Sequence, residues 1–206
     1  MHYINMLHYI KRIMDIVLAM GGLAVLSPVF IFCILMSYWQ LGPPIFFTQD
    51  RLGQGGKIFK IWKFRTMLIN ATHIVHSAPE FARMYAQDFK IPCSQSFLIP
   101  LWGRIMRKTS LDELPQLINV LKGDMSIVGP RPIVPLEIKK YGRYGPKLLT
   151  VNPGLTGYWQ VSGRNKIVYP DRIFYDMYYI DHQSIVLDLK IILRTVWVLL
   201  TMEGSN

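Results

Sequence analysis

The chain has 206 residues, of which 51% are hydrophobic and only 17% are charged. Disordered proteins are poor in apolar residues, so this composition excludes a chain that is disordered throughout. The 23 lysines and arginines exceed the 13 acidic residues and give a net charge of +10. Soluble nucleic-acid binders normally have a larger fraction of charged residues than this chain. A chain that is both basic and apolar is better suited to an anionic membrane surface, so no nucleic-acid partner is expected.

The first feature along the chain is an apolar segment, residues 16–49, that contains no Asp, Glu, Lys or Arg. It is long enough to cross about 30 Å of hydrocarbon as a helix. A secretory signal is not expected, because the run is too long for the apolar part of a signal peptide and no small-residue cleavage site follows it.

Basic residues flank this segment on both sides. Lys11 and Arg12 precede it, and the basic residues that follow closely are Arg51, Lys57, Lys60, Lys63 and Arg65. The positive-inside rule places both flanks in the cytoplasm, which a single membrane crossing cannot satisfy. A kinked spanning helix is the alternative, since transmembrane helices tolerate proline.

Ser27-Pro28 lies near the middle of the segment. Proline removes one backbone donor and clashes with the preceding turn, and the serine can bond a freed carbonyl. We expect residues 1–44 to form a re-entrant membrane helix that is broken at Ser27-Pro28. The sequence also predicts that Pro28→Ala straightens the helix and favours spanning.

Residues 45–206 are expected to form a cytosolic domain at the membrane interface. Two β-prone runs, 45–48 and 58–64, flank a glycine-rich segment and predict a β-hairpin. A variable, partly helical excursion follows at residues 68–100. The fold class expected is α+β: a membrane-embedded re-entrant helix and a small, mostly helical domain with one hairpin and interfacial amphipathic helices.

Three later segments have helical patterns. Residues 110–122, SLDELPQLINVLK, carry apolar residues at helical spacing, and Gly123 is a stop signal. Residues 134–149 and 185–202 combine apolar and basic side chains, which fits helices that lie on a membrane interface. A solvated helix for the first and a core helix for the second are the alternatives.

Asp112 and Glu113 are adjacent acids near a predicted helix start, in a chain with few acids. Ser110 and Glu113 match the capping box S-x-x-E, so a purely structural cap is one interpretation. With Ser110 as the cap, Pro115 would be at the fifth helical position, where its missing N–H costs a hydrogen bond. With Asp112 as the cap, the proline lies in the permissive first turn.

The same acids also fit phosphate chemistry. A helix N-terminus favours an ionised carboxylate, the form that a nucleophile needs, and paired carboxylates beside a basic surface suit a Mg²⁺-bound diphosphate. Downstream, the Gly-Pro-Arg-Pro turn at residues 129–132 fixes the backbone around Arg131. Arg131 could therefore clamp a phosphate, or the turn could be structural.

Three ordered motifs, KIFKIWKFRTM, RKTSLDELPQLINVLKGDMSIVGPRP and PGLTGYWQVSGRN, together resemble the bacterial sugar transferase family, the monotopic polyprenyl-phosphate phosphoglycosyl transferases. The resemblance begins near Lys11 and covers nearly the whole chain. It is greatest to catalytic domains that transfer hexose phosphates, often galactose 1-phosphate. Larger relatives carry extra membrane helices before this part, so the chain is expected to correspond to the minimal catalytic unit.

The resemblance implies transfer of a sugar 1-phosphate from a UDP-sugar to undecaprenyl phosphate, with release of UMP, as the first membrane step of surface glycan synthesis, such as O-antigen or exopolysaccharide. It implies Asp112 as nucleophile and magnesium ligand, Glu113 in a supporting role, and a re-entrant helix with its break at Ser27-Pro28. The implied cofactor is Mg²⁺, the implied partners include membrane lipids and a second copy in a homodimer, and the implied location is the cytoplasmic face of the bacterial inner membrane.

Further cations are candidates for binding substrate phosphates. They are Arg131, Arg164 and Lys108, with Arg104 and Arg107 as secondary candidates, and a solvated surface charge is the alternative for the last four. Asp176 and Asp188 are expected to support the site or to be structural.

Two other functions compete with this interpretation. A membrane-anchored module that binds lipid or nucleic acid without catalysis would tolerate the loss of the Asp112 carboxylate. A two-metal phosphodiesterase would need more clustered acids than the sequence provides.

Overall fold

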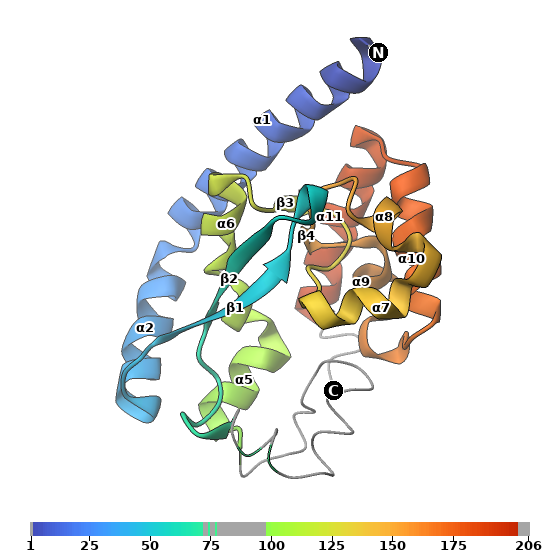
Figure 1. Ribbon diagram of the computed structural model, residues 1–206. Helices are drawn as coiled ribbons and strands as arrows, with labels where there is room; N and C mark the ends of the chain where they lie inside the picture. Colours follow the sequence, from blue (N-terminus) through green and yellow to red (C-terminus); the bar gives the residue numbers. More distant parts are fainter. Residues whose placement is uncertain (1, 72–73, 75–76, 78–97, 202–206) are drawn as a thin grey trace.

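The computed structural model describes residues 2–71, 74, 77 and 98–201 (Figure 1). Most of the excursion predicted at residues 68–100 lies outside this part of the chain, so that prediction is not tested. The N-terminal elements are α1 (His2–Val25), α2 (Ser27–Leu41), β1 (Phe46–Leu52), the 3₁₀ turn η1 (Gln54–Gly56) and β2 (Ile58–Phe64). The central elements are α5 (Leu101–Thr109), η2 (Leu111–Glu113), α6 (Gln116–Lys122) and β3 (Ser126–Val128). The C-terminal elements are η3 (Pro135–Glu137), α7 (Ile138–Tyr141), η4 (Gly142–Tyr144), α8 (Gly145–Leu148), β4 (Gly154–Thr156), α9 (Tyr158–Ser162), η5 (Arg164–Lys166), α10 (Asp171–Asp181) and α11 (Ile185–Thr201).

The apolar N-terminal segment forms a bent pair of helices, with an angle of 62° between α1 and α2. The Ser27 hydroxyl donates to the carbonyl of Ala24 at 2.8 Å, and Pro28 lies in the first turn of α2, where its missing N–H costs nothing. In the described part of the chain, no single helix is long and apolar enough to cross a membrane, whereas the bent pair passes that test of length and composition. The predicted break is therefore present.

Charged residues fasten α1 to the domain. The ammonium of Lys11 donates to the carbonyl of Val128 at 2.9 Å and pairs with Asp188 at 2.6 Å. Arg12 donates to two carbonyls of the last turn of α6, at 2.6 and 2.7 Å, where a cation complements the helix dipole. The buried carboxylate of Asp15 accepts hydrogen bonds from the hydroxyl of Ser126 and from a backbone N–H of β3.

The far end of the helix pair is fastened to the same domain. One nitrogen of Arg65, which follows β2, donates to the carbonyls of Leu41 and Gly42 at 2.6 Å each. Another nitrogen of this guanidinium donates to the carbonyl of Pro44 at 2.7 Å. Both ends of the N-terminal segment therefore contact one body, and Figure 1 shows α1 and α2 along one side of it.

The predicted hairpin is confirmed. β1 pairs antiparallel with β2, from Phe46 opposite Phe64 to Leu52 opposite Ile58, and a second small sheet pairs β3 with β4 in parallel. Alternate residues of β2, among them Phe59 and Ile61, are buried against α1 and α6. The combination of helices with small sheets confirms the α+β class.

Backbone segments meet closely beside the second sheet. A Cβ added to Gly154 would lie 2.0 Å from the backbone nitrogen of Gly129, and one added to Gly157 would lie 2.3 Å from the carbonyl oxygen of Gly129. Any side chain at these positions would separate the two loops. The glycines therefore hold the Gly-Pro-Arg-Pro turn against the PGLTG segment.

Two helix predictions are wrong in detail. Residues 110–122 do not form one helix: η2 comes first, Pro115 precedes α6, and Ser110 is the left-handed residue that ends α5. Residues 134–149 form a series of short helices, η3, α7, η4 and α8, and not one helix, and Gly142 with its positive φ of 48° marks the break after α7. The final helix is close to its prediction, with Ile191 and Val198 buried on one face.

Candidate active site

Asp112 lies in the turn η2 between α5 and α6, and its side chain is buried. The turn exists because Ser110 takes a left-handed conformation with a φ of 59°, which ends α5 abruptly. The side chain of Ser110 makes no capping hydrogen bond, so the predicted capping box is absent. The two acids lie in the first turn of the 3₁₀ helix η2 and not at the start of α6, which begins only at Gln116.

Burial and neighbouring charges set the ionisation of Asp112. Burial raises the pKa of this carboxyl to about 6, with Lys63 and Arg107 opposing the rise and Glu113 adding to it. Apart from its own backbone N–H, the carboxylate has no hydrogen-bond or ion-pair partner among the residues that the structure describes. At neutral pH the group is thus mostly ionised and available to react.

Glu113, by contrast, is paired. Its carboxylate lies 2.6 Å from the ammonium of Lys63, and both side chains are partly buried. Lys63 comes from β2, so the hairpin brings a cation to the acidic pair from a distance of 50 residues along the chain. From the sequence, Lys63 was identified only as a basic residue that flanks the apolar segment. Its place near the end of a strand whose alternate residues are buried is the signal that could have indicated a role in the site.

Arg107 is the second cation beside Asp112. It is half-buried on α5, and its Nε donates to the hydroxyl of Thr66 at 2.9 Å. Thr66 follows Lys63 and Arg65 in the motif KFRT, whose residues thus contact Glu113, the end of α2 and Arg107. One short segment connects the helix pair with the acidic turn.

Arg164 approaches the turn from the C-terminal part of the chain. One of its terminal nitrogens donates to the hydroxyl of Ser110 at 2.7 Å. The other, Nη1, is buried and has no hydrogen-bond partner among the described residues. Burial lowers the pKa of Arg164, whereas the charge of Glu113 raises it. Arg164 therefore lies beside the acidic turn, and its role in binding phosphate stays a prediction.

Arg131 has different neighbours. Burial raises the pKa of Tyr169 and of Asp176, and the charge of Arg131 offsets part of this rise. Arg131 is not one of the leading charges on Asp112. The turn that carries it is held by Arg51, which donates to the carbonyl of Pro132 at 2.8 Å. The structure thus places Arg131 beside a buried polar cluster and shows no contact between it and the acidic pair.

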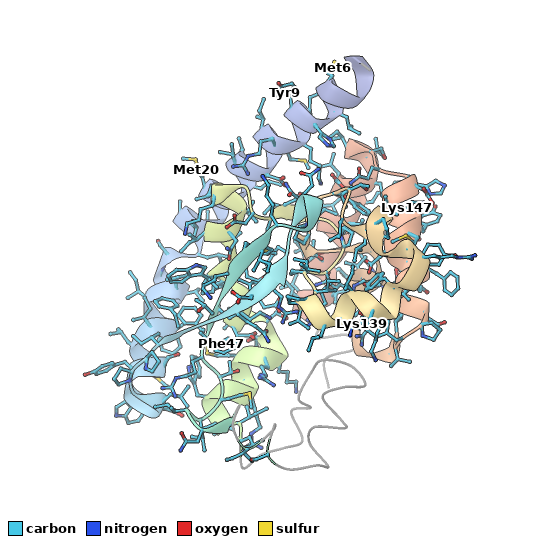
Figure 2. The ribbon with its side chains drawn as sticks, viewed as in Figure 1. Met6, Tyr9, Met20, Phe47, Lys139 and Lys147 are labelled. Carbon is cyan, nitrogen blue, oxygen red and sulfur yellow. The ribbon has the colours of Figure 1, made fainter. Side chains whose placement is uncertain are left out.

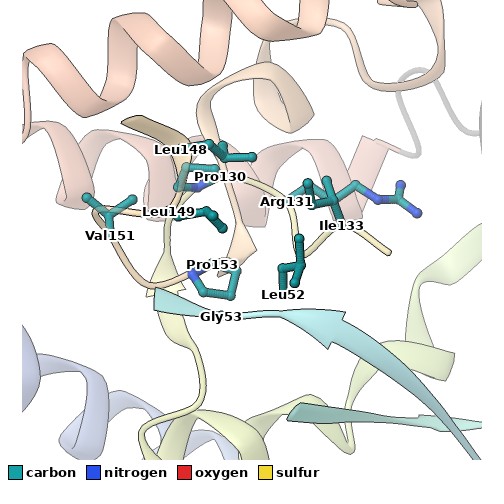
Figure 3. Close-up of a pocket in the computed structure, with 9 residues that line it drawn as sticks. All are labelled: Leu52, Gly53, Pro130, Arg131, Ile133, Leu148, Leu149, Val151 and Pro153. Atoms are coloured by element: carbon teal, nitrogen blue, oxygen red, sulfur yellow. The ribbon is translucent and has the colours of Figure 1, made fainter. Parts of the chain in front are cut away.

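An apolar pocket lies behind this turn (Figure 3). Its lining includes Leu52, Ile133, Leu149 and Pro153, and Figure 3 shows the guanidinium of Arg131 directed away from them. The pocket offers no charged group to a phosphate apart from that arginine.

The other predicted residues are structural or exposed. Lys108 and Arg104 lie exposed on α5. Asp188 is buried and pairs with Lys11, and Asp176 is buried with its Oδ2 accepting from the hydroxyl of Tyr141 at 2.8 Å. Neither acid contacts the turn that carries Asp112 in the interactions that the structure shows.

The acidic pair fits a Mg²⁺ site in which substrate supplies some of the ligands. Within the described residues, no three acidic, histidine or cysteine side chains form a group that could hold a metal by themselves. Mg²⁺ in phosphoryl-transfer sites is bound through one or two carboxylates together with substrate phosphates and water. The carboxylate of Asp112, which has no side-chain partner within the described part of the chain, and its neighbour Glu113 match that ligand set.

Known proteins resemble this chain over most of its length. The pattern of the family described as bacterial sugar transferase matches residues 6–202. The chain is 42% identical to a galactosyl transferase of Streptococcus agalactiae, over 95% of this chain and 43% of that protein. It is 39% identical to the undecaprenyl-phosphate galactose phosphotransferase of Salmonella typhimurium, over 96% of this chain and 42% of that protein.

A shorter relative is covered almost fully. The chain is 37% identical to an exopolysaccharide production protein of Sinorhizobium fredii, over 95% of this chain and 87% of that protein. The chain thus spans about two fifths of some curated relatives and most of others. The resemblance inferred from the three motifs is confirmed: the chain belongs to the bacterial sugar transferase family.

Proposed function

We propose that the chain transfers a hexose 1-phosphate, with galactose 1-phosphate as the leading candidate, from a UDP-sugar to undecaprenyl phosphate and releases UMP. The observation that carries this proposal is the buried, unpaired carboxylate of Asp112 among the cations Lys63 and Arg107. The names of relatives that act on undecaprenyl phosphate support the acceptor, and those of exopolysaccharide proteins support a role in surface glycan synthesis.

The reaction proceeds in two displacements at one phosphorus atom. A carboxylate oxygen of Asp112 attacks the sugar-linked phosphorus of the donor, the bond to the bridging oxygen breaks, and UMP leaves with that oxygen. A phosphate oxygen of the lipid then attacks the aspartyl-phosphosugar and displaces the carboxylate, which gives the lipid diphosphate-linked sugar. Because donor and acceptor are both anionic, a covalent intermediate lets them bind in turn.

The surrounding side chains have distinct tasks. Lys63 holds Glu113 and, with Arg107, keeps the Asp112 carboxylate ionised. The unpaired nitrogen of Arg164 can donate to an oxygen of the donor diphosphate. Asp112 and Glu113 are the residues that would hold Mg²⁺, which supplies charge neutralisation on phosphate oxygens when bound.

The helix pair supports a site at the membrane surface. Its two ends are fastened to one domain by Lys11 and Arg65, which favours a re-entrant segment over a spanning one. Apolar side chains along α1 point outward, among them Met6, Tyr9 and Met20 (Figure 2). The domain of residues 45–206 would then lie on the cytoplasmic face of the inner membrane, level with the lipid phosphate.

The test is UMP release from a panel of UDP-sugars, in detergent with Mg²⁺ and undecaprenyl phosphate. Repeated turnover should require the lipid and one sugar, whereas one equivalent of UMP per protein should form with the aspartyl adduct without the lipid. Asp112→Asn should abolish both UMP release and the covalent adduct. Asp181→Asn is the matched control, because that exposed aspartate pairs with Lys147 away from the site. Absence of release from every donor by folded protein, or retained turnover in Asp112→Asn, would contradict the proposal.

A further inference from the structure

Ser110 and Arg164 share an unusual backbone feature. They are the two residues other than glycine that have a positive φ in the described chain, 59° for Ser110 and 49° for Arg164. Such conformations are costly for side-chain-bearing residues and persist where the surroundings require them. The two residues are 54 positions apart and contact each other directly.

The backbone of Ser110 has a role that glycine would fill better. Its N–H bonds to carbonyls of the last turn of α5, and its carbonyl accepts from the N–H of Glu113 at 3.2 Å. A left-handed residue at the end of a helix is most often glycine, which has no Cβ to strain the backbone. The backbone role alone therefore does not explain a serine here.

The hydroxyl of Ser110 explains why this position carries a serine and not a glycine. This oxygen accepts a hydrogen bond of 2.7 Å from Nη2 of Arg164. The guanidinium is planar and rigid, so fixing one nitrogen also fixes the direction of the other. Nη1 is buried and without a hydrogen-bond partner among the described residues, although a buried donor normally has one.

We propose that Ser110 is a positioning residue: its hydroxyl holds Arg164 so that Nη1 donates to the diphosphate of a nucleoside diphosphate donor bound at Asp112. This inference rests on the proposed function and names a residue that the family motifs do not explain. The hydrogen bond joins the turn that carries the nucleophile to the loop after α9. Formation of the turn and orientation of the arginine are therefore coupled.

The first experiment compares Ser110→Gly with Ser110→Thr. Glycine removes the hydroxyl and relieves the backbone, so we expect a higher Tm together with about tenfold weaker binding of UDP. Threonine keeps the hydroxyl but places a β-branched residue in a left-handed conformation, so we expect a lower Tm with UDP binding retained. UDP affinity is measured by calorimetry in detergent with Mg²⁺, and Tm by thermal unfolding.

The second experiment is a double-mutant cycle with Arg164→Ala. If the serine acts through the arginine, adding Ser110→Gly to Arg164→Ala should weaken UDP binding no further. Equal UDP affinity of Ser110→Gly and wild type, or affinities that follow Tm in both serine variants, would overturn the positioning role.

These readouts separate the two proposals. If the wild type binds UDP but releases UMP from no UDP-sugar, the proposed transferase activity fails, and the affinities still decide the role of Ser110. If the folded wild type does not bind UDP, both proposals fail.

Discussion

Two buried carboxyl groups, those of Asp112 and Asp176, have different surroundings and therefore different consequences. Cations lie beside the first, so it is mostly ionised at neutral pH although it is buried. Asp176 accepts one hydrogen bond from Tyr141, and its Oδ1 has no hydrogen-bond partner among the described residues. Burial raises the pKa of Asp176 to about 7, against the opposing effects of Tyr141 and Arg172.

This shift makes the stability of the fold depend on pH. The folded state keeps the proton on Asp176 up to about pH 7, whereas the unfolded state loses it near the ordinary aspartate pKa of 3.8. Stability is therefore expected to fall as pH rises between these values, by up to about 1.4 kcal/mol per pH unit. Asp176→Asn lacks this dependence, so relative to wild type it should gain about 3 kcal/mol between pH 5 and pH 8.

The measurement is the free energy of urea unfolding of both proteins at pH 5 and pH 8. Tyr141→Phe is the companion variant, because it removes the hydrogen bond that lowers the pKa of Asp176. The loss of stability should then extend to higher pH. A constant difference between Asp176→Asn and wild type would show that the carboxyl does not change ionisation in this range.

Lys63 offers a second prediction at the level of single residues. Lys63→Met removes the partner of Glu113 and one of the two cations that favour the ionised form of Asp112. We expect about a hundredfold lower kcat/KM for UMP release, the size of effect seen when one charge-stabilising donor is lost. Lys60→Met is the matched control, since this lysine lies three residues earlier on the same strand in an exposed pair with Asp50.

Exposed ion pairs contribute little to stability, so the control should keep activity and Tm near those of wild type. Wild-type kcat/KM in Lys63→Met would show that Lys63 does not contribute to the reaction.

At the level of elements, prediction succeeded where the signals were local. The hairpin follows from two β-prone runs around a glycine-rich turn; its second strand has the predicted bounds, and its first, Phe46–Leu52, is longer than predicted. The helix at residues 110–122 was wrong because its start depends on a distant partner: Arg164 bonds the hydroxyl that would have served as the cap. Lys63 was overlooked for the same reason, since Glu113 reaches it only through tertiary structure.

The contact between Gly129 and Gly154 gives a prediction for the small sheet. Gly154→Ala would place a methyl carbon 2.0 Å from a backbone nitrogen, and backbone atoms cannot move away as a flexible side chain would. We expect a loss of about 3 kcal/mol in the free energy of unfolding.

Gly21→Ala is the control for this variant. A Cβ on that glycine of α1 would meet no atom of the described residues within 4 Å, and alanine is the better helix former, so stability should be unchanged or slightly higher. The two variants are compared by urea unfolding in detergent. Equal stability of both would show that the loops can separate without cost.

At the scale of the whole molecule, the proposed membrane location makes a prediction about the side of the membrane on which the two ends of the helix pair lie. The sequence alone assigned the turn to Ser27-Pro28 and predicted that Pro28→Ala favours spanning. The structure adds polar contacts at both ends, of Lys11 with Asp188 and of Arg65 with the carbonyl of Leu41. A spanning helix would have to break one of these sets and leave buried charges without partners, which is strongly disfavoured.

We therefore expect both ends on the cytoplasmic side, even in Pro28→Ala. Single cysteines at the exposed positions His8 and Gln54 report the two ends, with Cys33 and Cys93 replaced by serine. A membrane-impermeant maleimide should label both in inside-out vesicles and neither in intact spheroplasts, with and without Pro28→Ala. His8→Cys could instead be labelled in spheroplasts with Pro28→Ala but not without it. That result would mean that the proline, and not the contacts of Lys11 and Arg65, makes the segment re-entrant. The same labelling without that substitution would mean that the segment spans the membrane.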